Sequence, residues 1–301
     1  ALRFINSAGT WSPDGQKLAF VVFKEGNNAI AFLDVKSRKL ERTVTPTGMD
    51  AMTNLAWSPD GRYVAISGSH GGIGNLYLYD IQDQSFRQLT NDRYAQMEPA
   101  WSPDSRTLAY VTDQVPGTNF DSLTFARVKI ALLDVESGHT SLINLADSAK
   151  MINPQYSPDG RSLYFISDPD GFSDLYRYSF DDSLFYRITT IATGVSGLTE
   201  LSPAMSVAAK TGRMVFTVFN NTNYDVLSLD SSETIGTPIS PGAQVVDIGG
   251  FLPYANEKTS VTEYLQQPEA GLVSGKNFKV KKYNPSLSLD YVGQTGIGLA
   301  V

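Results

Sequence analysis

The chain of 301 residues contains no cysteine and only two histidines. Without cysteine it can form neither a disulfide nor a thiolate metal site. Its 24 Lys and Arg are outnumbered by 31 Asp and Glu, and the net charge of −7 argues against binding to nucleic-acid phosphates. No apolar run is long enough to span a bilayer, and no signal peptide begins at Ala1. Because the chain starts without Met, we expect a mature or excised piece of a longer protein.

A five-residue motif recurs along the chain. WSPDG occupies residues 11–15 and again 57–61, WSPDS residues 101–105, and YSPDG residues 156–160. The motif serines are 46, 44 and 55 residues apart, a period typical of propeller blades and of helical arrays. We expect a degenerate fifth copy at LSPAMS, residues 201–206, where Ala-Met in place of Asp-Gly predicts a different turn.

The segments that follow each copy distinguish blades from helices. KLAFVVF, YVAISGS, TLAYVTD, SLYFISD and RMVFTVF are short, apolar and rich in β-branched and aromatic residues, as strands are. A second strand is predicted in each unit, for example at NLYLYDI, and a third in most units. The segment leading into each motif supplies a fourth. These units predict an all-β fold, a β-propeller of four-stranded blades with five blades legible.

Turn chemistry accounts for the motif itself. Proline presets φ at the first corner, aspartate can accept a hydrogen bond from its own downstream backbone, and glycine tolerates positive φ. Ser105 stands where the other copies have glycine, which predicts a slightly relaxed turn. The aromatic residue before each serine is expected to pack between neighbouring blades. We therefore assign structural roles to Trp11, Pro13, Asp14, Trp57, Pro59, Asp60, Trp101, Pro103, Asp104, Tyr156, Pro158 and Asp159.

The motif, the apolar strand after it, and the patterns around LYLYD and RQLTND together resemble the repeats of TolB-like β-propellers, distant relatives of the WD repeats. The resemblance covers roughly residues 1–235 and implies six blades, the sixth lying upstream of Ala1 or within residues 236–301. Residues 189–219 are similar to part of large bacterial envelope proteins that also carry a metallopeptidase-like domain and a surface-antigen-type barrel. We expect residues 236–301 to form a remnant blade or packing segment and a linker towards such a barrel.

Catalytic and metal-binding signatures are missing from the sequence. It has no G-x-S-x-G elbow and no H-E-x-x-H motif, and its two histidines have no identifiable nucleophile beside them. Residues 168–174, DPDGFSD, gather three carboxylates around a glycine but lack the distal Glu of a calcium loop, so a polar hairpin is expected. We therefore expect this chain to be no enzyme and to hold no cofactor or metal.

A binding surface is expected on one set of loops. In a four-stranded blade the loop after the second strand and the loop leading into the first strand open on the same face, and loops on a rigid scaffold often carry function. The longest, residues 113–122, is the best candidate for recognition, with an idle surface loop as the alternative. The candidate partner-binding residues are His70, Arg93, Tyr94, Asp113, Asn119, Phe120, Asp121, Asp168 and Asp170.

Three functions remain open at this point. The first is a non-catalytic protein- or peptide-binding module of the bacterial cell envelope, for which the acidic loops favour a basic or neutral partner segment. The second is a substrate-gating propeller domain of a peptidase whose catalytic domain lies outside this chain. The third is a structural subunit of an envelope assembly. The resemblance implies a periplasmic or outer-membrane-associated location, and the oligomeric state does not follow from the sequence.

Overall fold

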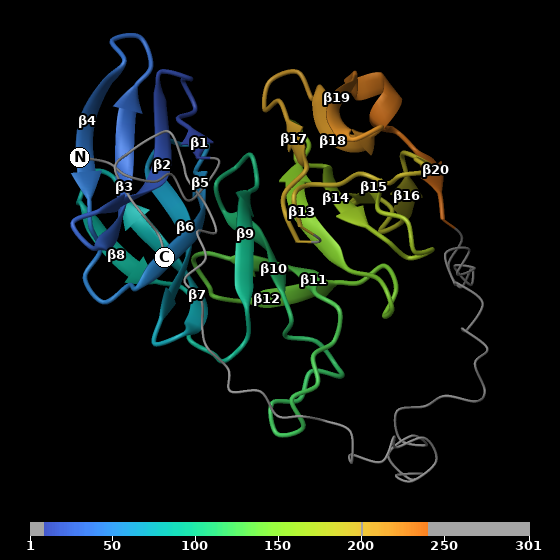
Figure 1. The fold of residues 1–301 in the computed structure, drawn as a ribbon, viewed down its shortest axis with the longest axis horizontal. Coiled ribbons are helices and arrows are strands. Elements are labelled where there is room, and N and C mark those ends of the chain that lie inside the picture. The colour runs from blue at the N-terminus through green and yellow to red at the C-terminus, as the bar shows by residue number, and fades with distance from the viewer. Residues whose placement is uncertain (1–8, 200, 240–301) are drawn as a thin grey trace, which may run out of the picture. The chain divides into compact units, whose positions relative to one another are not determined.

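The computed structural model describes residues 9–199 and 201–239 of the chain. Within these ranges every regular element is a strand except one 3-10 helix, η1 (Ser231–Thr234), as Figure 1 shows. Nowhere in this described part does a helix have the length and apolarity needed to cross a membrane. The prediction of an all-β fold is confirmed.

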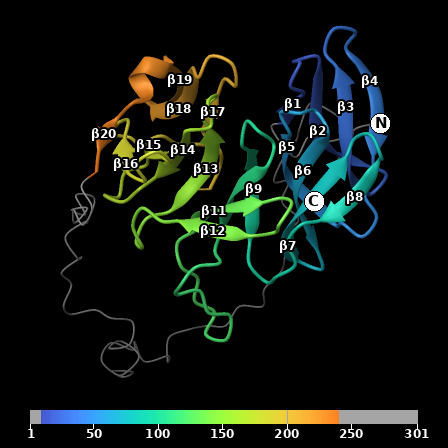
Figure 2. The ribbon, with the colours of Figure 1, turned by 180° about the vertical axis from the view of Figure 1, so that it is seen from behind.

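The strands form five separate antiparallel sheets, which we call blades 1 to 5 in chain order (Figures 1 and 2). Blade 1 contains β1 (Thr10–Trp11), β2 (Lys17–Lys24), β3 (Asn27–Asp34) and β4 (Lys39–Val44). Blade 2 contains β5 (Ala51–Trp57), β6 (Tyr63–His70), β7 (Ile73–Asp80) and β8 (Ser85–Gln88). Blade 3 contains β9 (Gln96–Trp101), β10 (Thr107–Thr112), β11 (Lys129–Asp134) and β12 (Thr140–Ile143). Blade 4 contains β13 (Met151–Tyr156), β14 (Ser162–Ser167), β15 (Asp174–Ser179) and β16 (Phe185–Arg187), and blade 5 contains β17 (Met205–Val207), β18 (Met214–Asn220) and β19 (Asn223–Leu229).

Each blade is an up-and-down meander of consecutive hairpins. The first strands of successive blades, β1, β5, β9, β13 and β17, contact one another in chain order. The sheets are therefore arranged as the blades of a propeller, as the repeat predicts. The expected sixth blade falls outside the described residues.

The chain leaves blade 5 in an unexpected direction. After β19 and η1, the short strand β20 (Thr237–Pro238) pairs with the outer edge of blade 4, where Tyr186 faces Pro238 and Arg187 faces Thr237. Blade 4 thus has five strands, and blade 5 has three within the described residues. The added strand covers an edge of β16 that would otherwise expose unpaired backbone groups.

The core of the protein lies between blades rather than within them. Four hydrophobic clusters each join consecutive blades: one packs Phe32 of blade 1 against Tyr79 of blade 2, and another packs Ile130 of blade 3 against Phe165 of blade 4. The central strands are apolar on both faces, and all six residues of β14 are buried. A strand that is buried on both faces has apolar residues at nearly every position. This explains why these segments do not alternate strictly between apolar and polar residues.

The repeated motif forms the turn between the first and second strands in blades 1 to 4. In blade 4, the Ser157 hydroxyl donates to Asp159 Oδ1 at 2.6 Å and accepts from the Ser162 backbone N–H at 2.9 Å. The same serine bonds occur in the other three copies. The serine hydroxyl is also the main reason why the pKa values of Asp14, Asp104 and Asp159 lie below the usual aspartate value. The turn prediction is confirmed, and the motif serine is its central hydrogen-bonding group.

Two expectations about these turns are wrong. Ser105 does not relax its turn but adopts the left-handed φ of 60° that the other copies give to glycine, and its hydroxyl accepts a hydrogen bond from the Asp60 backbone N–H at 3.0 Å. In blade 5 the corresponding turn is formed by residues 208–213, with Gly212 at φ 68°, whereas Ser202 and Pro203 precede β17. The LSPAMS segment resembles the motif by composition only, since it leads into β17 and the turn between β17 and β18 lies further along the chain.

The aromatic residues of the motif pack towards the preceding blade, as predicted. Trp57 makes an edge-to-face contact with Phe32 of blade 1 at 5.6 Å between ring centroids. Trp101 is buried and donates from Nε1 to the Ala56 carbonyl of blade 2 at 3.0 Å, and Tyr156 packs on the cluster between blades 3 and 4. Trp11 differs, being 57% exposed, because no blade among the described residues precedes blade 1.

Bulges in the inner strands connect successive blades by hydrogen bonds. Glu98 and Asn153 adopt positive φ at bulges in β9 and β13. Glu98 Oε2 accepts from the Asn153 backbone N–H at 2.6 Å, and Asn153 Oδ1 accepts from the N–H groups of Ala204 and Met205 at 2.9 and 2.7 Å. A bulge redirects a side chain that would otherwise point into the sheet packing. These two side chains therefore connect blade 3 to blade 4 and blade 4 to blade 5.

Replacing the motif serine of blade 4 tests the turn. Ser157→Ala removes the acceptor of the Ser162 N–H in a buried place, so we expect the free energy of unfolding to fall by about 1–3 kcal/mol in urea titrations. Ser141→Ala, on the exposed outer strand β12, is the control and should change stability by less than about 0.5 kcal/mol. Equal effects of the two variants would contradict the role of the serine.

The carboxyl of Glu98 predicts a pH dependence of stability. Burial raises its pKa from 4.5 to about 7, so at intermediate pH the folded chain holds a proton that the unfolded chain has released. The stabilisation that this raised pKa gives to the folded chain is therefore complete at acidic pH, below the unfolded pKa of 4.5. It is lost as the pH rises towards the folded pKa of about 7. The unfolding free energy of the parent chain should fall between about pH 5 and 8 as Glu98 loses its proton. In Glu98→Gln this fall should be smaller by on the order of 2 kcal/mol, measured by urea titration at each pH. Glu136→Gln, an exposed carboxyl in the β11–β12 turn, is the control, and an unchanged slope in Glu98→Gln would refute the assignment.

Candidate functional site

The loops after the second strands and the loops leading into the first strands meet on one face of the blades. Three aspartates make the connection in the same manner: Asp50 accepts from the Gly71 N–H at 2.6 Å, Asp113 from the Ala95 N–H at 2.7 Å, and Asp168 from the Lys150 N–H at 2.8 Å. Because each bond joins the two loops of one blade, this face has a hydrogen-bonded framework. We call it the loop face.

The longest loop on this face, residues 113–128 between β10 and β11, has structure of its own. Asn119 and Thr124 form an antiparallel bridge, with reciprocal backbone bonds of 2.8 and 3.0 Å. The Asn119 side chain accepts from the N–H groups of Asp121 and Ser122 at 2.8 and 3.2 Å, which closes the tip of the hairpin. The loop is the green hairpin that extends away from β10 and β11 in Figure 1. Its geometry is that of a small preorganised projection.

An aromatic cluster gathers around Phe120 on this hairpin. Its ring centroid lies 5.3 Å from that of Tyr94 and 5.9 Å from that of Phe125, and Arg93 Cζ lies 4.5 Å from it. Both Arg93 and Tyr94 come from the loop leading into β9, so the two loops join here through side chains. We name Arg93, Tyr94, Phe120 and Phe125 the Phe120 cluster. The sequence had placed the first three of these residues on neighbouring loops, and the structure brings them into contact.

Two exposed apolar residues extend the cluster towards solvent. Phe125 is 58% exposed, and Leu123, at the tip with φ 52°, is 74% exposed. Sequence reasoning missed both, because the loop was taken to end at Ser122. The sequence could have indicated them, because Leu123 and Phe125 are large apolar residues in a loop otherwise rich in polar and turn-forming residues.

Some charged side chains beside the Phe120 cluster already have hydrogen-bond partners within the protein, and others are exposed to solvent. Asp113 is occupied by the Ala95 N–H, and Asp92 accepts from the N–H of Tyr94 at 2.9 Å. Asp121 lies exposed on the hairpin. Arg93 forms no ion pair within residues 9–199 and 201–239, so its guanidinium rests on the Phe120 ring with its outer edge exposed. A partner would meet an aromatic and cationic surface with a carboxylate at its margin.

The carboxylates of the blade 4 loop are engaged by cations of the protein. Asp170 is buried and pairs with Arg187 at 2.7 Å, and Asp174 pairs with the same guanidinium at 2.6 Å. Asp168 lies 3.8 Å from Lys150 Nζ and keeps part of its surface exposed. Within the described ranges, no three His, Cys, Asp or Glu side chains are grouped so that they could hold a metal ion. The acidic residues here fasten the loop.

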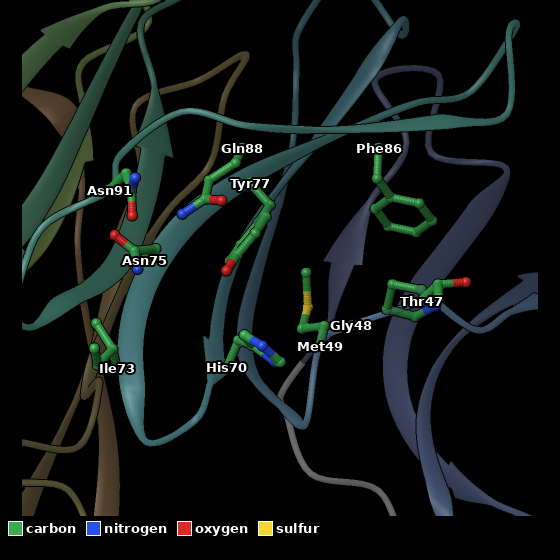
Figure 3. Close-up of a pocket in the computed structure, with 11 residues that line it drawn as sticks. Thr47, Gly48, Met49, His70, Ile73, Asn75, Tyr77, Phe86, Gln88 and Asn91 are labelled. Carbon is green, nitrogen blue, oxygen red and sulfur yellow. The ribbon is translucent and has the colours of Figure 1, made fainter.

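A pocket of about 350 Å³ lies where blade 2 meets the loop leading into β5, and we call it the rim pocket (Figure 3). His70, the remaining predicted contact residue, stands at its edge, with Nδ1 3.6 Å from Asp50 Oδ2. Asn91 belongs to the same loop as Arg93 and Tyr94, so the rim pocket and the Phe120 cluster share one loop. The sequence identified His70 but gave it no partner, because the other lining residues come from separate segments.

Comparisons with known proteins agree with this architecture. A family profile described as the TolB β-propeller domain matches residues 3–119. The chain is 31% identical over 194 residues to an uncharacterized protein of Agrobacterium fabrum, covering 62% of this chain and 59% of that protein. It is 21% identical over 233 residues to the Tol-Pal system protein TolB of Francisella tularensis, with 62% and 51% covered. A match to an uncharacterized peptidase of Bacillus subtilis has 26% identity over 189 residues, 52% of this chain and 29% of the peptidase. The chain thus spans between 29% and 59% of these curated relatives.

Solved structures support the fold. TolB from Acinetobacter baumannii superposes with a TM-score of 0.59 at 16% identity, over 75% of this chain and 52% of that one. A TolB-like protein from Agrobacterium tumefaciens superposes with a TM-score of 0.58 at 24% identity, over 78% and 80%. The repeated motif, the meander blades and these similarities agree: residues 3–119 match the TolB β-propeller domain, and the described blades have the fold of a TolB-like propeller.

Proposed function

We propose that this chain is a non-catalytic module of the bacterial cell envelope that binds a protein or peptide through the Phe120 cluster. The observation that carries the proposal is that Arg93, Tyr94 and Phe125 all pack on Phe120, which stands on a preorganised, projecting hairpin. Arginine and tyrosine are enriched among residues that dominate binding energy, and a rigid hairpin reduces the ordering cost of association. The Tol-Pal relatives support a periplasmic location.

The chemistry of the cluster indicates the kind of partner. Leu123 and Phe125 offer apolar surface at the tip, which favours a partner segment with an apolar or aromatic anchor. Asp121 at the margin and the net charge of −7 favour a partner segment that is neutral or basic overall. Arg93 can in addition donate to a backbone carbonyl of the bound segment.

A second candidate is a substrate-gating domain of a peptidase whose catalytic part lies outside this chain. The observation that favours it is the match to the Bacillus subtilis peptidase, of which only 29% is covered. The two functions differ in what they require of the isolated chain. A binding module forms a stable complex by itself, whereas a gating domain acts only when joined to its catalytic domain.

Truncation of the Phe120 ring tests the first function. The chain would be used to capture partners from an envelope extract, and a partner identified by mass spectrometry would be purified and titrated by calorimetry. Phe120→Ala should weaken binding by about tenfold or more, because it removes the ring on which Arg93 and Tyr94 pack. The melting temperature should stay within a few degrees of the parent, since the hairpin lies outside the inter-blade cores.

Phe172→Ala is the matched control. Phe172 is an exposed phenylalanine on the corresponding loop of blade 4, on the same face but outside the Phe120 cluster. Its truncation should leave the affinity unchanged. The proposal fails if Phe120→Ala binds as well as the parent chain, or if both variants lose affinity equally.

A further inference from the structure

The rim pocket combines a polar end with an aromatic end. Figure 3 shows the amides of Asn75, Gln88 and Asn91 gathered on one side, Phe86 on the other, and Tyr77 between them. Met49 and Ile73 complete its apolar surface. Its volume of about 350 Å³ lies within the range of small-molecule sites.

Two of the amides are held in defined orientations by the protein. Asn75 is buried, and its Oδ1 accepts from the Thr90 hydroxyl at 3.1 Å and from the Asp92 N–H at 3.3 Å, which leaves the NH₂ group of this lining residue as a donor that makes no hydrogen bond within the described residues. Gln88 Nε2 donates to the Thr90 carbonyl at 2.8 Å, which leaves Oε1 as an acceptor. The pocket therefore presents a fixed donor beside a fixed acceptor. Adjacent hydroxyl groups of a ligand, each able to donate and to accept, match such a pair.

The remaining polar group in the middle of the pocket is the Tyr77 hydroxyl, which has no hydrogen-bond partner within the part of the chain that the structure describes. Burial raises the pKa of Tyr77 above its ordinary value, so the phenol stays protonated and can donate. The Phe86 ring packs on its cross-strand neighbour Tyr79 at 4.8 Å between centroids, which restricts its movement. Flat aromatic faces next to amides suit a ring that is apolar on its faces and hydroxylated at its edge.

The charges around the pocket restrict the ligand further. Its lining contains no Lys, Arg, Asp or Glu, and the carboxylate noted above, Asp50, accepts from the Gly71 N–H and lies 3.6 Å from His70 Nδ1. An anionic ligand would find no Lys or Arg in the lining, only His70 at the edge beside Asp50, and a cationic ligand would lack a direct counter-ion. From these contacts we infer that the rim pocket binds a neutral saccharide, with hydroxyls on Asn75 and Gln88 and a sugar face on Phe86. This inference is independent of the partner role proposed for the Phe120 cluster.

Methyl NMR on the full 301-residue chain provides the test. The six methionine methyl groups give few signals, and Met49 reports on the pocket. Titration with cellobiose and with N,N′-diacetylchitobiose should shift the Met49 signal saturably, with a Kd on the order of 1 mM for at least one of them. Met205, in the cluster between blades 4 and 5, should not move. Glucuronate should bind at least tenfold more weakly, because no Lys or Arg lines the pocket to pair with its carboxylate.

Two variants separate the site from nonspecific binding. Tyr77→Phe keeps the ring and removes only the hydroxyl, and Gln88→Ala removes the free acceptor; each should weaken the sugar about fivefold or more. Gln82→Ala, on the exposed β7–β8 turn, should leave the affinity unchanged. The inference is overturned if neither sugar shifts Met49, if glucuronate binds as tightly as the neutral sugars, or if both pocket variants retain the parent affinity. Saturable binding of a neutral peptide such as Ala-Ser-Ala, with both sugars silent, would make the pocket a peptide site instead.

Discussion

The structure depends on packing between sheets that share no common ladder. Each blade has its own hydrogen-bonded strands, and consecutive blades pack against each other through their apolar faces. Removal of this apolar surface from water is the main favourable contribution to the free energy of folding. It acts at every interface between blades, because every blade repeats the same apolar pattern. Apolar packing alone does not set the position of one sheet on the next. Directional bonds between inner strands, such as those of Glu98 and Asn153, supply that specification.

The two ends of the blades serve different purposes. At one end the motif turns are closed by serine and aspartate and pack on each other, so that a Cβ at Gly160 would lie 3.4 Å from Pro103 of the preceding blade. That end leaves little freedom for variation in length. At the loop face the connections range from the two residues between β2 and β3 to the sixteen between β10 and β11. A rigid end and a variable end are what a scaffold needs if loops are to acquire binding residues without loss of the fold.

The loop face carries two adjacent surfaces of different chemistry. The Phe120 cluster projects and is aromatic and cationic, whereas the rim pocket is concave, neutral and rich in amides. They are linked through the loop leading into β9, in which Asn91 lines the pocket while Arg93 and Tyr94 belong to the cluster. Asp92, between them, accepts from the N–H of Tyr94 and donates its own N–H to Asn75. A ligand in the pocket would therefore contact the same loop that supports the cluster.

The letters of the sequence by themselves determined the all-β class, the blade repeat and the motif turns, because these depend on local chemistry: proline, aspartate and glycine at fixed offsets, and apolar runs of strand length. They also placed Arg93, Tyr94 and Phe120 on one face, since the topology of a blade dictates where its loops open. Predictions from the local sequence pattern failed where the packing of distant segments determines the structure. The LSPAMS segment resembles the motif but does not form the turn, and Leu123 and Phe125 were missed just beyond the expected end of the loop. Only the tertiary structure could reveal the bond from Glu98 to blade 4 and the rim pocket, because their partners are far apart along the chain and meet only when the blades are packed.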